Sequence, residues 1–559
     1  EIRKKIIRGE MPLESVINGN PGEIKAGLVE ENGRILMRKR CEKHGDFEDV
    51  ISTNPAFTRR IENLFFGRDF ELADGAAIRR HGSSAIRYGR GTVLTVDLTN
   101  RCNMMCIPCF TDANQVGYVH EPGFEEIRNI LDRAVSFKPR RQVIILFSGG
   151  EPTISPHFLD AVAYARRIGF YRILAATNGI RFAQSGDFAR QAKAAGLDGA
   201  YLQFDGATNE ANRHRGVKNL FDVKLRAIEN MAAAGIKTTL VTTVINTVNR
   251  ETVGQVVNFA IDNVDSIQTV VFQPVSFTGR DEEIDDESRA AKRYPLSMLA
   301  EDLHLQLDGK IEPLRDWFPL SAYSAFTSIM DVLQPPDAGW GWSSCNCHPD
   351  CGVFTLLVIN RRTREWTPLF RFFDYERFLR DLRVIADTAR GRRLIQVQLA
   401  QAVMRNYKPG LAPAGFPISQ MLQLFRPGAG TSGSDRIDRM KKNPENRDGW
   451  RVLCVEGMLF QDLYTYDFRR TEMCVIPYGT QEGEISFCAY NTGIGWRRIV
   501  ENAHKTADLA EWNRTRGRHE IFAAGKTVEL EKRSQCSLNV QSCAAGDRTG
   551  APQPTPERR

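Results

Sequence analysis

The chain lacks any apolar run of about 18 residues, so the sequence predicts no membrane-spanning helix. Cysteine is sparse, with 12 in 559 residues, and no signal-peptide pattern is visible, which argues against a disulfide-rich secreted fold. The chain also lacks a strong excess of one charge sign. Its net charge is only +7 and its basic residues are spread out, so we expect no nucleic-acid partner. These absences predict a cytoplasmic protein, with docking to an anionic membrane surface as the alternative.

The cysteines that are present are unevenly placed. Cys102, Cys106 and Cys109 lie in one short run with Cx3Cx2C spacing. Three thiolates in one loop can hold three irons of a [4Fe–4S] cube and leave the fourth iron open to a small molecule. A structural zinc site needs four ligands, usually as two separated pairs. The spacing therefore predicts a cluster with one open iron.

The segment around this loop alternates between strand-like and helix-like runs. Six strands with helices between them predict parallel pairing and right-handed crossovers, that is, a partial (β/α)6 barrel in an α/β fold. A complete eight-unit barrel is the alternative, but the pattern stops after the sixth strand. The predicted strands are 92–98, 142–147, 172–176, 199–204, 238–245 and 267–273, and the predicted helices are 124–135, 156–168, 187–195, 221–234 and 252–263.

Polar, turn-prone residues follow several of these strands. Each is ordinary turn chemistry when taken alone. Because the ends of parallel strands meet at one edge, together they outline a ligand site beside the three-cysteine loop. They are Gly149, Gly150 and Glu151 after the second strand, Asn178 after the third, and Gln203 and Asp205 at the fourth.

This combination resembles the radical S-adenosylmethionine (SAM) superfamily over about residues 90–280. The resemblance implies that SAM binds the open iron and is reductively cleaved to a 5′-deoxyadenosyl radical, which abstracts hydrogen from an unactivated C–H. It also implies that Gly149, Gly150 and Glu151 contact the methionine amino group. Asn178, Gln203 and Asp205 would contact the ribose and carboxylate. One departure is Pro108, where the superfamily often has an aromatic residue; Phe110 follows the cluster instead.

A narrower resemblance is to the archaeal tetraether lipid synthases. It rests on the runs 41–45, 272–280 and 347–352. It implies carbon–carbon coupling on a lipid-like substrate, auxiliary [4Fe–4S] clusters and an N-terminal rubredoxin-like metal site. That last site is degenerate here, because no cysteine precedes Cys41, and Cys41 with His44 cannot complete a tetrahedral site.

Eight further cysteines follow the predicted barrel, enough for two fully ligated auxiliary [4Fe–4S] clusters. Some can instead be buried thiols, since free cysteine packs like a small hydrophobe, and Cys454 in an apolar run fits that alternative best. Cys474 and Cys488 flank a hairpin-like segment that turns near Gly483. The eight are Cys345, Cys347, Cys351, Cys454, Cys474, Cys488, Cys536 and Cys543.

The predicted function is therefore a radical SAM enzyme that couples carbons on a lipid-like substrate and takes electrons from a donor such as ferredoxin or flavodoxin. The alternatives are a peptide maturase, a cofactor methyltransferase and, from another class, a non-catalytic electron-transfer protein. The predicted segments are an N-terminal one (1–89), the barrel (90–281), a helical connection (282–340), an α+β auxiliary-cluster region (341–545) and a disordered tail (546–559).

Overall fold

The computed structural model describes residues 2–12, 15, 24–64, 85–86, 92–136, 144–326, 329, 347–388, 391–424, 449–531 and 536–540. Cys345, Cys543, the linker-like stretch 426–447 and the predicted tail lie outside these residues. No helix among the described residues is long and apolar enough to cross a membrane.

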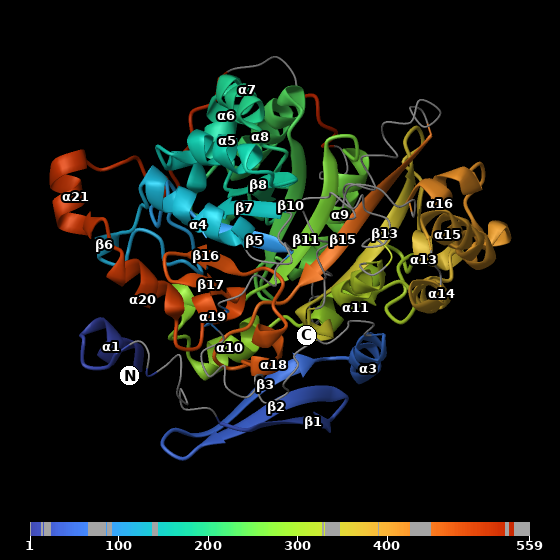
Figure 1. Cartoon of the computed structure of the whole chain (residues 1–559), viewed down its shortest axis with the longest axis horizontal. Coiled ribbons are helices and arrows are strands. Elements are labelled where there is room, and N and C mark those ends of the chain that lie inside the picture. The colour runs from blue at the N-terminus through green and yellow to red at the C-terminus, as the bar shows by residue number, and fades with distance from the viewer. Residues whose placement is uncertain are drawn as a thin grey trace, which may run out of the picture.

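One large mixed sheet forms the centre of the molecule (Figure 1). Its middle consists of six parallel strands, which confirms the six that the sequence predicts. Most side chains of these strands are buried, although β10 carries four threonines among its apolar residues. These strands are β5 (Val93–Asp97), β7 (Ile144–Ser148), β8 (Arg172–Thr177), β9 (Gly199–Gln203), β10 (Lys237–Val244) and β11 (Ile267–Pro274).

The predicted helices between these strands are also present. Gly196 and Gly235 end two of them in the left-handed conformation, at φ +116° and +77°, which only glycine adopts without strain. The helices are α4 (Phe124–Ser136), α5 (Phe158–Arg167), α6 (Ile180–Gln184), α7 (Gly186–Ala195), α8 (Leu220–Ala234) and α9 (Val253–Asp262).

The sheet does not stop after the sixth strand, contrary to the sequence prediction. β15 (Trp450–Met458) pairs in parallel with β11, and β13 (Gly352–Asn360) pairs antiparallel with β15. At the other edge, β16 (Tyr478–Thr480) lies parallel to β5. The C-terminal part of the chain therefore extends the central sheet on both sides.

The N-terminal segment forms a separate three-stranded antiparallel sheet. The predicted turn at Asn32 and Gly33 is confirmed, and both residues have positive φ, as a type I′ hairpin requires. Arg293 fixes this sheet to the rest of the molecule, because its buried guanidinium bonds both Asp49 and Asp462 at 2.6–3.3 Å. The strands are β1 (Ala26–Glu31), β2 (Arg34–Cys41) and β3 (Gly45–Ser52).

A helical lobe packs on β13 at one end of the long axis (Figure 1). Its interior is rich in aromatic side chains, including Phe370, Phe372 and Phe378, which pack against Phe354 and its neighbours on the strand. The lobe consists of α13 (Leu369–Phe372), α14 (Tyr375–Thr388), α15 (Arg392–Asn406) and α16 (Ile418–Leu424).

The remaining elements connect these parts or cover their edges. They are α1 (Ile2–Ile7), α3 (Pro55–Asn63), β4 (Ala85–Ile86), β6 (Tyr118–Val119), α10 (Asp286–Lys292), α11 (Leu296–Gln306), β12 (Phe318–Pro319), β14 (Trp366–Pro368), α18 (Phe468–Glu472), β17 (Gly483–Ile485), α19 (Phe487–Asn491), α20 (Trp496–Ala503), β18 (Ala507–Asp508) and α21 (Leu509–Arg516).

Candidate metal and cofactor site

The three-cysteine loop leaves the carboxyl end of β5, as predicted. Cys102 is buried, and Cys106 and Cys109 are half-buried. Asn114 closes the loop on itself: its side chain accepts the Cys102 N–H at 3.0 Å and donates to the Cys102 carbonyl at 2.8 Å. Burial, with Cys106 nearby, raises the pKa of the Cys102 thiol. A metal that takes thiolates offsets that cost of ionisation.

The glycine pair after β7 packs directly on this loop. The Gly150 N–H donates to the Thr99 carbonyl at 2.8 Å, and the Glu151 N–H donates to the Arg101 carbonyl at 2.9 Å. Gly149 has φ +131°, and a Cβ there would lie 2.2 Å from the Thr99 oxygen. Glycine is needed here because two backbones approach each other without room for a side chain.

Glu151 ties the ends of β7 and β8 together. Its buried carboxylate accepts hydrogen bonds from the Thr153 and Thr177 hydroxyls at 2.6 and 2.8 Å and from the Asn178 N–H at 2.7 Å. The Asn178 amide in turn donates to the Asn103 side chain at 2.6 Å, inside the three-cysteine loop. The structure thus brings Glu151 and Asn178 to the three-cysteine loop, as predicted, while their contacts to SAM stay a prediction.

Gln203 ends β9 with a buried side-chain amide whose nitrogen and oxygen both lack a hydrogen-bond partner among the described residues. An unsatisfied buried amide is costly, and a polar ligand would satisfy it. This is the observation by which the residues present fit SAM, a ligand rich in hydroxyl, amino and carboxylate groups.

Asp205 is already engaged by the protein. Its carboxylate pairs with the Arg215 guanidinium, meets His214 at 2.9 Å and accepts the Thr243 N–H at 2.9 Å. These partners hold the pKa of Asp205 well below its usual range despite its burial. Asp205 therefore positions Arg215, and the predicted contact to the ribose stays untested.

Three cations next to the loop, of which Arg215 and Lys224 are buried, were not predicted from the sequence. Arg215 donates to the Pro108 carbonyl at 2.9 Å, and Arg280 donates to the carbonyls of Cys106 and Ala113. Lys224 donates to the Asn178 carbonyl, and burial lowers its pKa to about 7. Cations here complement the negative charge of a thiolate-ligated cluster. Their spacing in the sequence does not indicate a shared site, because the three residues come from three different elements.

The C-terminal segment also reaches the site. His519 bonds the Cys102 carbonyl at 2.9 Å through Nε2, and the Phe522 N–H donates to the Asn103 carbonyl at 2.8 Å. Three residues later, the Gly525 N–H donates to the Gly216 carbonyl at 2.9 Å. This segment therefore joins the three-cysteine loop to the loop after β9.

A second group of cysteines gathers beyond β16. Burial and the neighbouring Cys488 and Cys351 thiols raise the pKa of Cys474 to about 12. The predicted hairpin is confirmed, since β16 and β17 pair antiparallel between Cys474 and Cys488. The buried Arg470 lies next to Cys351 and Cys488, where its positive charge favours their thiolate forms. Cys347, four residues before Cys351, is also buried.

Two predicted ligands lie elsewhere. Cys454 faces the aromatic core of the helical lobe, and its sulfur contacts Glu456 at 3.2 Å. Cys536 is exposed beside Glu229 of α8. The structure therefore does not bring either thiol to the Cys351 group.

Aromatic rings connect the two cysteine groups. Phe110, next to Cys109, lies 6.1 Å from Phe487 between ring centroids. The Phe487 N–H donates to the Cys474 sulfur at 3.4 Å. The three-cysteine loop and the Cys351 group are thus neighbours in the fold.

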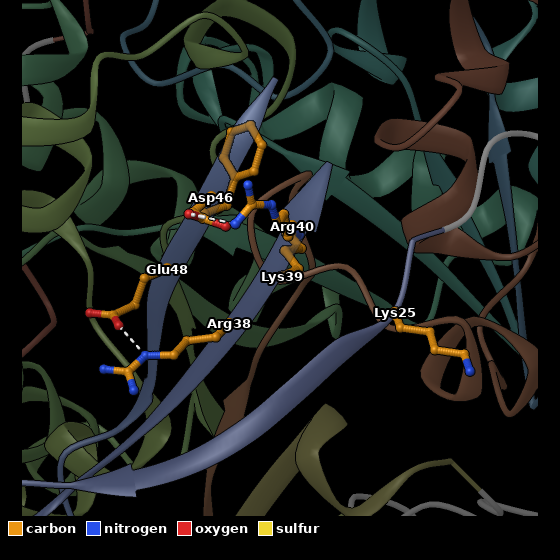
Figure 2. A pocket seen from close by; sticks show the side chains of 7 residues that line it. Lys25, Arg38, Lys39, Arg40, Asp46 and Glu48 are labelled. Atoms are coloured by element: carbon orange, nitrogen blue, oxygen red, sulfur yellow. Dashed lines mark hydrogen bonds and ion pairs between the residues drawn. The ribbon is translucent and has the colours of Figure 1, made fainter. Parts of the chain in front are cut away.

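The N-terminal sheet offers little that would hold a ligand. Figure 2 shows a basic pocket lined by side chains of β2 and β3, but Arg38 and Arg40 already face Glu48 and Asp46. At the turn between β2 and β3, the Cys41 Sγ lies 3.4 Å from the His44 Nδ1.

Gly279 provides a test of the loop packing. It has φ +61°, and a Cβ would lie 2.4 Å from the Phe110 carbonyl oxygen. We expect Gly279→Ala to displace the loop and to lower the iron bound after anaerobic reconstitution by about four atoms per chain. Gly415→Ala is the control, because that glycine has φ +77° and open space around it. Equal iron in the two variants would contradict the packing argument.

Residues 96–260 match the Radical SAM superfamily, and residues 22–53 match the HMPTM N-terminal zinc ribbon domain. The ribbon match agrees with the three-stranded sheet. Residues 22–53 do not supply the four ligands of a structural zinc site, because Cys41 is the only cysteine among them.

The chain is also similar to curated proteins. It is 28% identical over 508 residues to a 7,8-dihydro-6-hydroxymethylpterin dimethyltransferase of Methanocaldococcus jannaschii, covering 88% of this chain and 94% of that protein. It is 29% identical to an Fe-coproporphyrin III synthase of Methanosarcina barkeri, over 41% of this chain and 58% of that protein. It is 31% identical to a mycofactocin maturase of Mycobacterium ulcerans, over 30% of this chain and 42% of that protein.

The superfamily match runs from the end of β5 to α9, so the cysteine loop, the glycine turn and Gln203 all lie within it. Residues 96–260 are therefore a radical SAM domain, and the chain is a radical SAM enzyme.

Proposed function

We propose that this enzyme methylates an unactivated carbon of a reduced pterin or a similar small heterocycle. The hydrogen of the C–H bond would leave in 5′-deoxyadenosine, and a second SAM would give its methyl group and leave as S-adenosylhomocysteine, with the electrons coming from the external donor. The observation that supports this substrate class is the similarity to the pterin dimethyltransferase, which extends over 94% of that protein and reaches far beyond the radical SAM domain. The cofactor methyltransferase predicted as an alternative from the sequence thus becomes the main candidate.

Cys102, Cys106 and Cys109 would hold the [4Fe–4S] cluster. With SAM at its open iron, that cluster would supply the one electron that cleaves SAM into methionine and a 5′-deoxyadenosyl radical. Gln203 offers an unpaired donor and acceptor for SAM, and Arg215 and Lys224 compensate negative charge at the loop. The backbone contacts of Gly150 and Glu151 keep the loop in place while the ligand is exchanged. The electron donor of the ferredoxin or flavodoxin kind stays a prediction.

We further propose one auxiliary [4Fe–4S] cluster on Cys351, Cys474, Cys488 and Cys347. The first three thiols lie near one another beside Arg470, and the fourth precedes Cys351 by four residues. The second cluster that the cysteine count predicts stays a prediction, because Cys345 and Cys543 lie outside the described residues.

The iron content tests this assignment. We expect Cys474→Ser to lower the iron of the reconstituted enzyme by about four atoms per chain, because it removes one ligand of a four-thiolate cluster. Cys454→Ser is the matched control, since that thiol is buried in an apolar core. Loss of iron from the Cys454 variant together with a normal content in the Cys474 variant would contradict the assignment.

A lipid-like substrate is the second candidate. One observation favours it: α15 exposes Leu394, Val397 and Met404 on the face opposite its core, and an exposed apolar patch can mark a site of membrane or ligand contact. None of the three relatives described above is by its name a lipid enzyme, so this candidate rests on that surface and on the motifs in the sequence.

The substrate assay separates the two candidates. The reconstituted enzyme would be incubated anaerobically with dithionite, methyl-deuterated SAM and 7,8-dihydro-6-hydroxymethylpterin. We expect a pterin product with added methyl groups and 5′-deoxyadenosine formation that rises with pterin concentration, both measured by mass spectrometry. Failure of the pterin to react, with joined alkyl chains formed from added membrane lipid, would overturn the proposal in favour of the second candidate.

A further inference from the structure

Exposed aliphatic side chains concentrate in the helical lobe. Six of the sixteen large apolar side chains that are clearly exposed on the described residues lie between Val384 and Ile418. A few such residues are normal on any surface, but a contiguous group marks a place where another apolar body docks. The six are Val384, Leu394, Val397, Met404, Leu411 and Ile418, with exposed fractions of 38–59%.

α15 shows the arrangement most clearly, because it is apolar on two opposite faces. Ile395, Leu399 and Val403 point into the lobe core. Leu394, Val397 and Met404 recur at helical spacing on the other side and are about half exposed. Exposed apolar side chains that share one face of a helix form a candidate contact surface for an apolar partner.

Exposed arginines lie on the same two helices. Arg377, Arg380 and Arg383 of α14 are exposed, as are Arg392 and Arg393 at the start of α15. Within the described ranges, these five form no ion pair with a carboxylate.

The acids of the same helices and of the turn before them, Asp387 included, already have interaction partners. Glu376 pairs with Arg60 at 3.1 Å, Asp381 with Arg405 at 3.6 Å, and Asp374 with Lys408 at 3.8 Å. The positive charge of the outward face is therefore largely uncompensated, and its complement is an anionic surface.

We propose that the outer faces of α14 and α15 form a docking surface for an anionic lipid bilayer. Aliphatic side chains enter the boundary between headgroups and acyl chains, while arginine side chains extend to the lipid phosphates. The lobe's aromatic residues, which dominate the centres of protein–protein interfaces, are instead buried in its core. Figure 1 places the lobe at the opposite end of the long axis from α21, so a bilayer there leaves the rest of the molecule accessible.

Vesicle co-sedimentation of the full-length, anaerobically reconstituted enzyme tests the proposal. We expect binding to vesicles of phosphatidylglycerol and phosphatidylcholine, weak binding to phosphatidylcholine alone, and loss of binding as salt screens the arginines. Leu394→Glu with Val397→Glu, and separately Arg392→Glu with Arg393→Glu, should each weaken binding about tenfold or more. Leu305→Glu is the control, because Leu305 is 71% exposed on α11, outside the lobe.

Thermal unfolding and 5′-deoxyadenosine formation should be unchanged in all three variants, since the substituted side chains are exposed and lie outside the cysteine site. Two results would overturn the proposal. One is absence of wild-type binding to the anionic vesicles at low salt. The other is self-association of the wild type without lipid that the Leu394 and Val397 changes abolish, which would make this face an interface between copies of the chain. Both results are independent of whether the pterin reacts.

Discussion

Backbone hydrogen bonding to the three-cysteine loop is the constraint on which the rest of the structure depends. Gly150 after β7, Arg280 after β11 and Phe522 near the C-terminus each bond a main-chain group of this loop or of its entry from β5. These segments are far apart in the sequence. Three separate parts of the chain therefore hold the loop in one shape. Gly149 and Gly279 are needed as glycines because a Cβ at either position would clash with the backbone of the loop or of its entry from β5.

Positive side chains from separate segments also lie next to the cysteine groups. Burial disfavours the ionisation of the Cys102 and Cys106 thiols and raises the pKa of each. Arg215, Arg280 and Lys224 supply positive charge from beneath, and Asp205 keeps Arg215 in place. The same pattern recurs at the second cysteine group, where Arg470 lies between Cys351 and Cys488. Buried cations next to thiols are thus a shared device of both groups.

Local pattern was enough to predict the central strands, the helices between them and the Asn32–Gly33 hairpin, because each depends on neighbours in the sequence. It was not enough for β15 and β13. Their apolar runs are visible, but which sheet edge a strand joins is decided by contacts between distant segments. The apolar run around Cys454 had indicated a buried thiol, and the structure places it in the lobe core. Cys536 carried no such signal, since the direction in which a thiol points depends on the fold around it.

The candidate site was predictable as far as its strand ends. Gln203, Asn178 and Glu151 were found because polar residues after parallel strands meet at one edge. The supporting side chains, Arg215 and His519 among them, carry no spacing signal, and only the structure shows what they contact.

The central claim is that Cys102, Cys106 and Cys109 hold a cluster that cleaves SAM. The most direct measurement is 5′-deoxyadenosine formed by the reconstituted enzyme with SAM and dithionite under anaerobic conditions. The account predicts its formation by the wild type and its loss in Cys106→Ala. A wild-type enzyme that forms none, or a Cys106→Ala variant that forms it at the wild-type rate, would contradict the account.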